Sequence, residues 1–162
     1  MTMTGTNVQY NAALDPALDG AIDGPCHRYP LRVHYEDTDA GGVVYYANYL
    51  KFLERARTEA LLTIGLSNSI IKDKFGAYII VKSCNIDYKK PAYLEDNLCV
   101  TSYIKSVTKT SFLMNQTISK NDEIIADAQI NLVFINENGK PIKIPDIIFK
   151  NFKPYFSDIV KS

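Results

Sequence analysis

The sequence lacks tryptophan, holds only two histidines and three cysteines, and carries no excess charge of either sign. Its 18 basic and 18 acidic residues balance, which argues against a nucleic-acid partner, because such proteins normally show a basic excess or stripe. No apolar run reaches the roughly 20 residues that span a bilayer, so we expect no membrane span. The cysteines, Cys26, Cys84 and Cys99, show no metal-ligand spacing, so we expect free thiols in a reducing compartment and no bound metal.

The first 26 residues differ in composition from the rest of the chain. They contain no lysine or arginine, and aspartates at positions 15, 19 and 23 interrupt their only apolar stretch. This pattern is not that of a signal peptide, and it favours a cytoplasmic protein. We expect a mobile tail over residues 1–26 and one domain over residues 27–162, which is a usual domain length.

The spacing of apolar residues changes along the domain. Alternation predicts a half-buried strand over residues 29–35. From Tyr46 to Ile64 apolar residues recur every three or four positions, which predicts a helix of roughly five turns ended by Gly65. Strands rich in β-branched and aromatic residues follow, and then a short closing helix over residues 145–155. The four predicted strands cover residues 77–88, 97–107, 111–120 and 123–135.

The predicted order is one strand, one long helix and four strands in antiparallel succession, which is an α+β domain. One helix cannot cover both faces of a five-stranded sheet. An uncovered apolar face or edge is commonly satisfied by a second copy of the chain, so we expect self-association.

A short acidic segment separates the first predicted strand from the helix. Asp37 and Asp39 lie two positions apart, Gly41 and Gly42 allow a sharp turn, and the helix then begins with N–H groups that lack internal partners. Such a helix end can stabilise an oxyanion, while a neighbouring carboxylate can attack a carbonyl or activate water. The same residues also suit a simple helix cap and turn, and their spacing alone leaves both interpretations open.

A longer set of motifs surrounds this segment. The runs are YEDTDAGGVVY at 35–45, ANYLKF at 47–52 and ERARTE at 54–59, followed later by IDYKKPA at 86–92. They resemble the 4-hydroxybenzoyl-CoA thioesterase family, and most closely the bacterial branch whose members accompany the Tol-Pal envelope system. The resemblance covers about residues 28–140.

This resemblance implies a hotdog fold, in which a curved antiparallel sheet wraps around one long helix. It implies a homodimer or homotetramer with the active site at the dimer interface, and an acyl-CoA thioesterase of lipid metabolism. Asp39 matches the family's catalytic carboxylate, acting as nucleophile or general base. The backbone N–H of Tyr46 matches the amide that polarises the substrate carbonyl. No cofactor is implied, because coenzyme A is part of the substrate.

The chain departs from its branch at Tyr46, where many members have histidine. A phenol titrates near 10 and is a poor base at neutral pH, so we assign the function to the Tyr46 backbone and expect its ring to form pocket wall. Coenzyme A phosphates need cationic or amide groups. The expected substrate-binding residues are Gly42, Val43, Tyr45, Tyr49, Lys89, Lys90 and Lys109.

Two other interpretations stay open. The substitution at Tyr46 also suits a non-catalytic module that binds acyl-CoA or acyl carrier protein, or that serves as a scaffold. A hotdog hydratase is disfavoured, because neither His27 nor His34 is suitably placed. Glu54, on the predicted helix, is a rival carboxylate, although pairing with Lys51 or Arg57 at helical spacing explains it.

Overall fold

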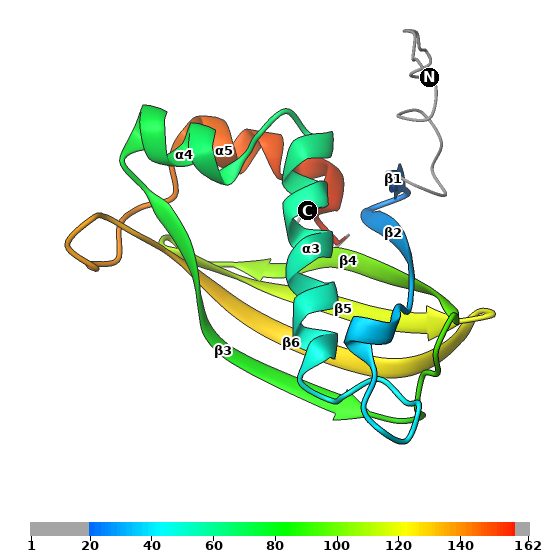
Figure 1. Ribbon diagram of the computed structural model, residues 1–162. Helices are drawn as coiled ribbons and strands as arrows, with labels where there is room; N and C mark the ends of the chain where they lie inside the picture. The colour runs from blue at the N-terminus through cyan, green and yellow to red at the C-terminus, as the bar shows by residue number, and fades with distance from the viewer. Residues whose placement is uncertain (1–19, 158–162) are drawn as a thin grey trace, which may run out of the picture.

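The computed structural model describes residues 20–157, which form one curved sheet and a small set of helices. Six antiparallel strands lie in the order β1-β2-β4-β5-β6-β3, and the long helix α3 crosses the concave side of the sheet (Figure 1). The strands are β1 Ala21–Asp23, β2 Cys26–Arg32, β3 Tyr78–Tyr88, β4 Asn97–Val107, β5 Ser111–Lys120 and β6 Glu123–Ile135. The helices are η2 Tyr35–Asp37, α3 Asn48–Thr63, α4 Asn68–Phe75, α5 Asp146–Asn151 and η3 Lys153–Tyr155.

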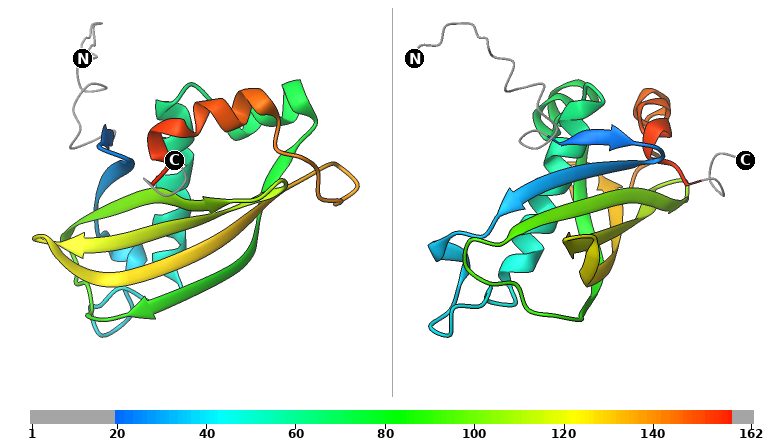
Figure 2. Two further views of the ribbon diagram at one scale, coloured as in Figure 1. Left: turned by 180° about the vertical axis from the view of Figure 1, so that it is seen from behind. Right: turned by 90° about the vertical axis from the view of Figure 1, so that its right-hand side faces the viewer.

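The core lies between α3 and the concave face of the sheet. Phe52, Leu53 and Ala56 of α3 are at most 1% exposed, because they recur at helical spacing on one side of the helix. Alternate residues of β4, β5 and β6 are buried against them, as the two-residue period of a strand requires. The sheet bends around the helix, as both views of Figure 2 show. The predicted hotdog arrangement is therefore confirmed.

The sheet has six strands, so the predicted number of five is wrong. The additional strand, β1, pairs with β2 through a tight turn in which Gly24 has a φ of 61°. Such a φ favours glycine, but a three-residue strand is too short to show a period in the sequence. β1 therefore precedes the predicted boundary at residue 27, and residues 1–19 of the predicted tail lie outside the described residues.

The structure also adjusts the elements around the acidic segment. β2 ends at Arg32, and the last residues of the predicted strand turn into η2. The long helix begins at Asn48, two residues after the predicted start. A further helix, α4, lies between α3 and β3, where the Ser67 side chain caps its first turn and Gly76 ends it.

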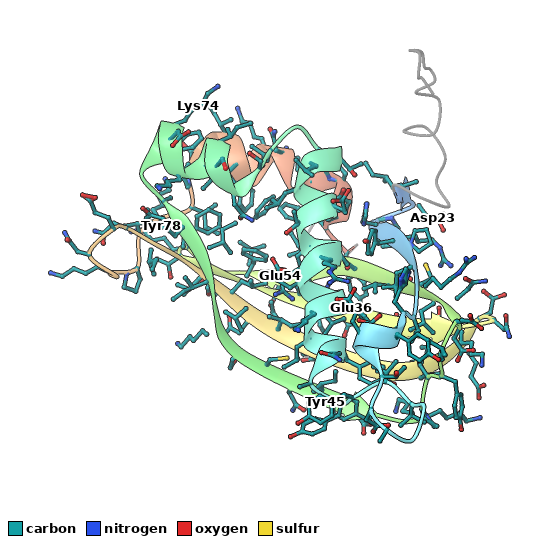
Figure 3. All side chains as sticks on the ribbon, in the orientation of Figure 1. Asp23, Glu36, Tyr45, Glu54, Lys74 and Tyr78 are labelled. Carbon is teal, nitrogen blue, oxygen red and sulfur yellow. The ribbon has the colours of Figure 1, made fainter. Side chains whose placement is uncertain are left out.

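The two ends of α3 have different surroundings. At its C-terminal end α5 and η3 pack over the core, where the Tyr155 hydroxyl donates to the Ala60 carbonyl at 2.8 Å. Figure 3 shows Tyr45 beside the opposite end and Glu54 about halfway along. Within residues 20–157, no helix has both the length and the apolar character needed to cross a membrane.

Strand β3 forms one edge of the sheet and pairs only with β6. Most of its eleven residues are exposed, among them apolar ones such as Ile80 and Val81. A long edge strand with exposed apolar side chains normally pairs with another chain or is covered. No described segment covers this edge.

Candidate active site

The acidic segment, residues 37–45, turns back on itself before α3. Asp37 is its buried anchor: its Oδ2 accepts the His34 N–H at 2.8 Å, and its carbonyl accepts the Tyr45 N–H at 2.9 Å. The Asn48 side-chain amide donates to the same carbonyl at 2.9 Å. Asp37 therefore holds the turn against the start of α3, and with 6% of its surface exposed it is less accessible than Asp39.

Asp39 lies at the exposed side of this turn. Its N–H donates to the Val43 carbonyl at 2.9 Å, and its Oδ1 accepts the Gly41 N–H at 2.8 Å. Gly42, with a φ of 80°, closes the loop and donates to the Asp39 carbonyl at 3.0 Å. The second carboxylate oxygen has no hydrogen-bond partner among residues 20–157. Asp39 thus has a fixed backbone and one oxygen free for chemistry.

The residues just before α3 supply backbone donors in the same segment as Asp39. The N–H groups of Tyr45 and Asn48 donate to backbone carbonyls, whereas those of Tyr46 and Ala47 find no acceptor within the described part of the chain. Unpaired N–H groups at a helix start carry partial positive charge and suit a negatively charged oxygen. One short segment therefore holds a carboxylate and N–H groups that are free to donate.

Aromatic side chains form the neighbouring wall. The Tyr88 hydroxyl donates to the Tyr46 carbonyl at 3.1 Å, which ties the end of β3 to the residues that lead into α3. The ring of Tyr88 lies 6.2 Å from that of Tyr46 and 5.4 Å from that of Tyr49. Burial raises the pKa of Tyr49, whose hydroxyl accepts the Ala92 N–H at 3.1 Å. Tyr49 is therefore mainly a buried support, while Tyr46 is exposed.

An open groove of about 250 Å³ runs beside these rings. It is lined by Val44, Tyr46, Tyr49, Tyr88, Lys89, Lys90 and Pro91. Four of the predicted site residues meet there, and Gly42, Val43 and Tyr45 lie in the adjoining turn. Lys89 already pairs with Asp87 at 3.1 Å, and Lys90 pairs with Glu123.

Lys109 is not brought to this groove within one chain. It lies in the hairpin between β4 and β5, next to Ile144, whose N–H donates to its carbonyl. That hairpin is level with the Tyr78 end of β3, whereas Lys89 and Lys90 follow the Tyr88 end. The three lysines can therefore share a site only if two chains contribute.

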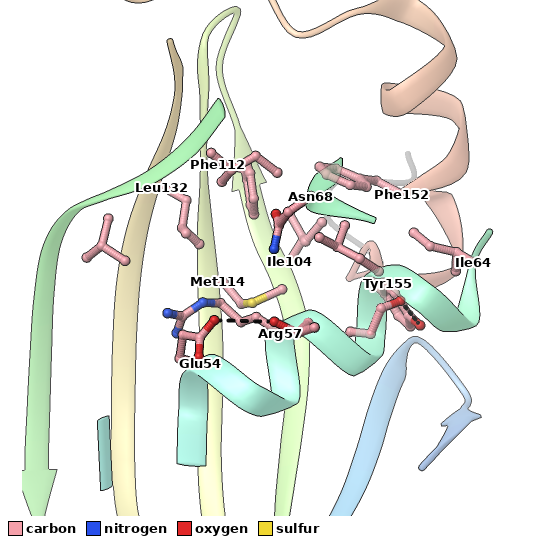
Figure 4. Close-up of a pocket in the computed structure, with 15 residues that line it drawn as sticks. Glu54, Arg57, Ile64, Asn68, Ile104, Phe112, Met114, Leu132, Phe152 and Tyr155 are labelled. Carbon is pink, nitrogen blue, oxygen red and sulfur yellow. Dashed lines mark hydrogen bonds between the residues drawn. The ribbon is translucent and has the colours of Figure 1, made fainter. Parts of the chain in front are cut away.

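A second, more enclosed cavity of about 170 Å³ lies between the middle of α3 and the sheet (Figure 4). Its wall is mostly apolar, with Phe112, Met114 and Leu132 from the strands, but Glu54 and Arg57 of α3 also line it. Glu54 is eight residues beyond Tyr46, or about 12 Å along a helix. It therefore does not compete with Asp39 in the same chain. Sequence reasoning missed Arg57 as a cavity residue, because its partner Gln116 is distant in the sequence.

Comparison with known proteins agrees with this architecture. The Thioesterase-like superfamily matches residues 33–152. The acyl-CoA thioester hydrolase YbgC of Escherichia coli is 38% identical over 128 residues, which cover 78% of this chain and 95% of the relative. The chain belongs to the Thioesterase-like superfamily.

Solved structures support the same assignment. A probable thioesterase from Bartonella henselae superposes with a TM-score of 0.72 at 32% identity, covering 74% of this chain and 99% of that one. A 4-hydroxybenzoyl-CoA thioesterase variant has a TM-score of 0.74 at 21% identity, covering 79% and 99%. The predicted family is therefore confirmed. The roles of the individual site residues stay predictions.

Proposed function

We propose that the protein is an acyl-CoA thioester hydrolase whose chemistry takes place at the turn before α3. The observation that carries this proposal is that one segment holds both an Asp39 carboxylate oxygen and a Tyr46 N–H without partners among residues 20–157. The enzyme class agrees with that of the E. coli relative, which is named an acyl-CoA thioester hydrolase.

The reaction needs one nucleophile and one oxyanion donor. Either the Asp39 carboxylate attacks the thioester carbon, or it removes a proton from a water molecule that attacks. In both routes the carbonyl oxygen becomes negative, and the Tyr46 N–H stabilises it. The carbon–sulfur bond then breaks and the thiol of coenzyme A leaves. In the direct route water hydrolyses the resulting anhydride and restores Asp39.

The groove beside the turn suits the coenzyme A part of the substrate. Lys89 and Lys90 are exposed, and exposed ion pairs contribute little stability, so either lysine can exchange its carboxylate for a phosphate at small cost. The exposed ring of Tyr46 forms the wall between these lysines and the turn. We assign the groove to the substrate's coenzyme A, with acyl carrier protein as a possible alternative donor of the acyl group.

The exposed edge of β3 supports a dimer. Antiparallel pairing of two β3 edges would place the Tyr88 end of one strand opposite the Tyr78 end of the other. The turn of one chain, which Tyr88 holds, would then approach the enclosed cavity and Lys109 of its partner. We therefore place the active site at the interface of a homodimer, or of a homotetramer built from two such dimers. A cytoplasmic location and a role in lipid metabolism complete the proposal.

Hydrolysis of an acyl-CoA panel, followed by thiol release, tests the proposal. We expect turnover by the wild type and a loss of at least about 100-fold in Asp39→Asn, because a general base contributes that much or more. Glu36→Gln removes an exposed carboxylate from the same segment and is the matched control. Wild-type turnover in Asp39→Asn would refute the role of Asp39.

A non-catalytic acyl-CoA or acyl carrier protein binding module is the second candidate. It is favoured by one feature, the tyrosine at position 46 where the related branch often has histidine. Calorimetry with an acyl-CoA, run beside the thiol assay, distinguishes the two. Tight binding without any thiol release would favour the module.

A further inference from the structure

Arg57 is an unusual residue for the cavity that it lines. The remaining wall is largely apolar, and Figure 4 shows the guanidinium beside Met114 and Glu54 at one end of the space. Partial burial lowers the pKa of Arg57, because its charge is poorly solvated, and the charge of Glu54 offsets only part of this effect. A buried cation is normally compensated by a carboxylate. No carboxylate oxygen lies within 4.0 Å of Arg57 among residues 20–157.

A rigid polar network holds this arginine in place. Its Nη1 donates to Gln116 Oε1 at 2.9 Å. The Gln116 amide nitrogen donates to the Leu53 carbonyl at 3.1 Å and to Ser102 Oγ at 2.9 Å. Gln116 and Ser102 are at most 1% exposed. Because both amide protons are used, the Gln116 oxygen is fixed toward Arg57, and the guanidinium is positioned in advance.

Most of the hydrogen-bonding capacity of Arg57 is unused. A guanidinium has five N–H donors in a planar fork, and one of its nitrogens has a partner among the described residues. Glu54 lies one turn earlier, but it is exposed and accepts the Thr58 hydroxyl at 3.3 Å instead of forming an ion pair with Arg57. The group best matched to this free fork is a carboxylate, which arginine binds through two parallel hydrogen bonds.

We propose that Arg57 selects acyl groups that end in a carboxylate, so that the favoured substrates are coenzyme A thioesters of dicarboxylic acids. This inference rests on the proposed thioesterase function. The cavity of about 170 Å³ limits the chain, since a cavity of about 150 Å³ holds a benzene molecule of six carbons. The methylenes contact the apolar wall, and the terminal carboxylate meets Arg57.

The position of Arg57 also determines which catalytic turn serves this cavity. Arg57 is eleven residues beyond Tyr46, or about 16 Å along α3. A chain short enough for the cavity does not bridge that distance, so the thioester reaches the Tyr46 amide of the partner subunit across the β3 edge.

Adipoyl-CoA and hexanoyl-CoA form a matched pair of six-carbon substrates that differ in the terminal carboxylate. We expect the wild type to have at least about tenfold higher kcat/KM for adipoyl-CoA, in line with a hydrogen bond between charged groups. Arg57→Met should lower kcat/KM for adipoyl-CoA about 10- to 100-fold and leave hexanoyl-CoA within a few-fold. Arg57→Lys should restore part of the preference. Arg55→Met, at an exposed arginine on the same helix, is the control.

The outcomes separate this inference from the proposed function. Hydrolysis of both substrates at similar kcat/KM in the wild type and in Arg57→Met would overturn the inference and leave the thioesterase intact. If the wild type hydrolyses neither, the thioesterase proposal fails, and calorimetric Kd values for the two thioesters decide the inference. Equal Kd values in the wild type would overturn it. If Arg57→Met does not fold, the wild-type preference and Arg57→Lys still decide.

Discussion

The turn before α3 and the cavity under its middle are built in opposite ways. Asp39 is exposed and bonds to residues a few positions away, Gly41 and Val43, although longer-range bonds from residues 92–94 also hold this turn. The cavity wall is buried, and its polar bonds join Arg57 with Gln116, 59 positions apart. Under the proposed function, backbone geometry near Asp39 positions the reacting groups, whereas long-range packing shapes the space for the acyl group. A change in one region should leave the other largely intact.

The largest expected effect comes from the buried network. Gln116→Leu removes the acceptor of Arg57 and two donors in the core, so we expect the free energy of unfolding to fall by about 2–4 kcal/mol. Denaturant unfolding measures this, with Gln129→Leu on an exposed position of β6 as the control. If the two variants are equally stable, the network does not support the cavity.

Acid should lower the stability of the fold through His27 of β2, which is also a buried polar residue. His27 is fully buried, its Nδ1 has no hydrogen-bond partner in the described part of the chain, and burial lowers its pKa from 6.5 to about 4. The unfolded chain therefore binds a proton that the folded chain excludes, and stability falls as the pH drops from about 6.5 to about 4. We expect His27 to contribute about 2–3 kcal/mol to this loss.

His27→Gln separates this contribution from that of the carboxylates. The variant can keep a contact with Thr63, which lies 3.3 Å from His27 Nε2. Chemical unfolding at several pH values should show a shallower loss below pH 6.5 in the variant. Parallel curves for the two proteins would show that His27 is not the titrating group.

Gly42→Ala should affect the turn with little effect on the cavity. The φ of 80° is strained for alanine, so we expect a cost of about 1 kcal/mol in stability and a fall of about tenfold or more in kcat, because Asp39 and Tyr46 shift together. Gly139→Ala places the same strain, at a φ of 79°, in a distant hairpin. Similar kcat losses in both variants would contradict a local role for the turn.

The smallest effect is expected for Tyr88→Phe. It removes the hydroxyl that donates to the Tyr46 carbonyl, so kcat should fall a few-fold while KM stays nearly constant, in line with the modest net value of one hydrogen bond. Tyr93→Phe, at a nearby exposed ring, is the control. An unchanged kcat would mean that β3 does not position the first turn of α3.

Features set by local sequence could be predicted, and features set by long-range contacts could not. The bounds of β4, β5 and β6 match the prediction, because two-residue alternation and polar hairpins are local signals. The turn with Asp39 was predictable for the same reason, together with the family motifs. The pairing of Arg57 with Gln116 was not, because no local pattern indicates which residues meet across a sheet. The separation of Lys109 from Lys89 likewise depends on the sheet order.

The closing segment after β6, with α5 and η3, can change the size of the enclosed cavity without changing the sheet. Phe152 and Tyr155 line the enclosed cavity, yet they belong to neither the sheet nor the turn. Substitutions there can resize the cavity that we propose for the acyl group, while Asp39 and Tyr46 stay where they are. Substrate range and reaction chemistry can therefore evolve independently in this protein, with new specificities arising from a dozen residues near its C-terminal end.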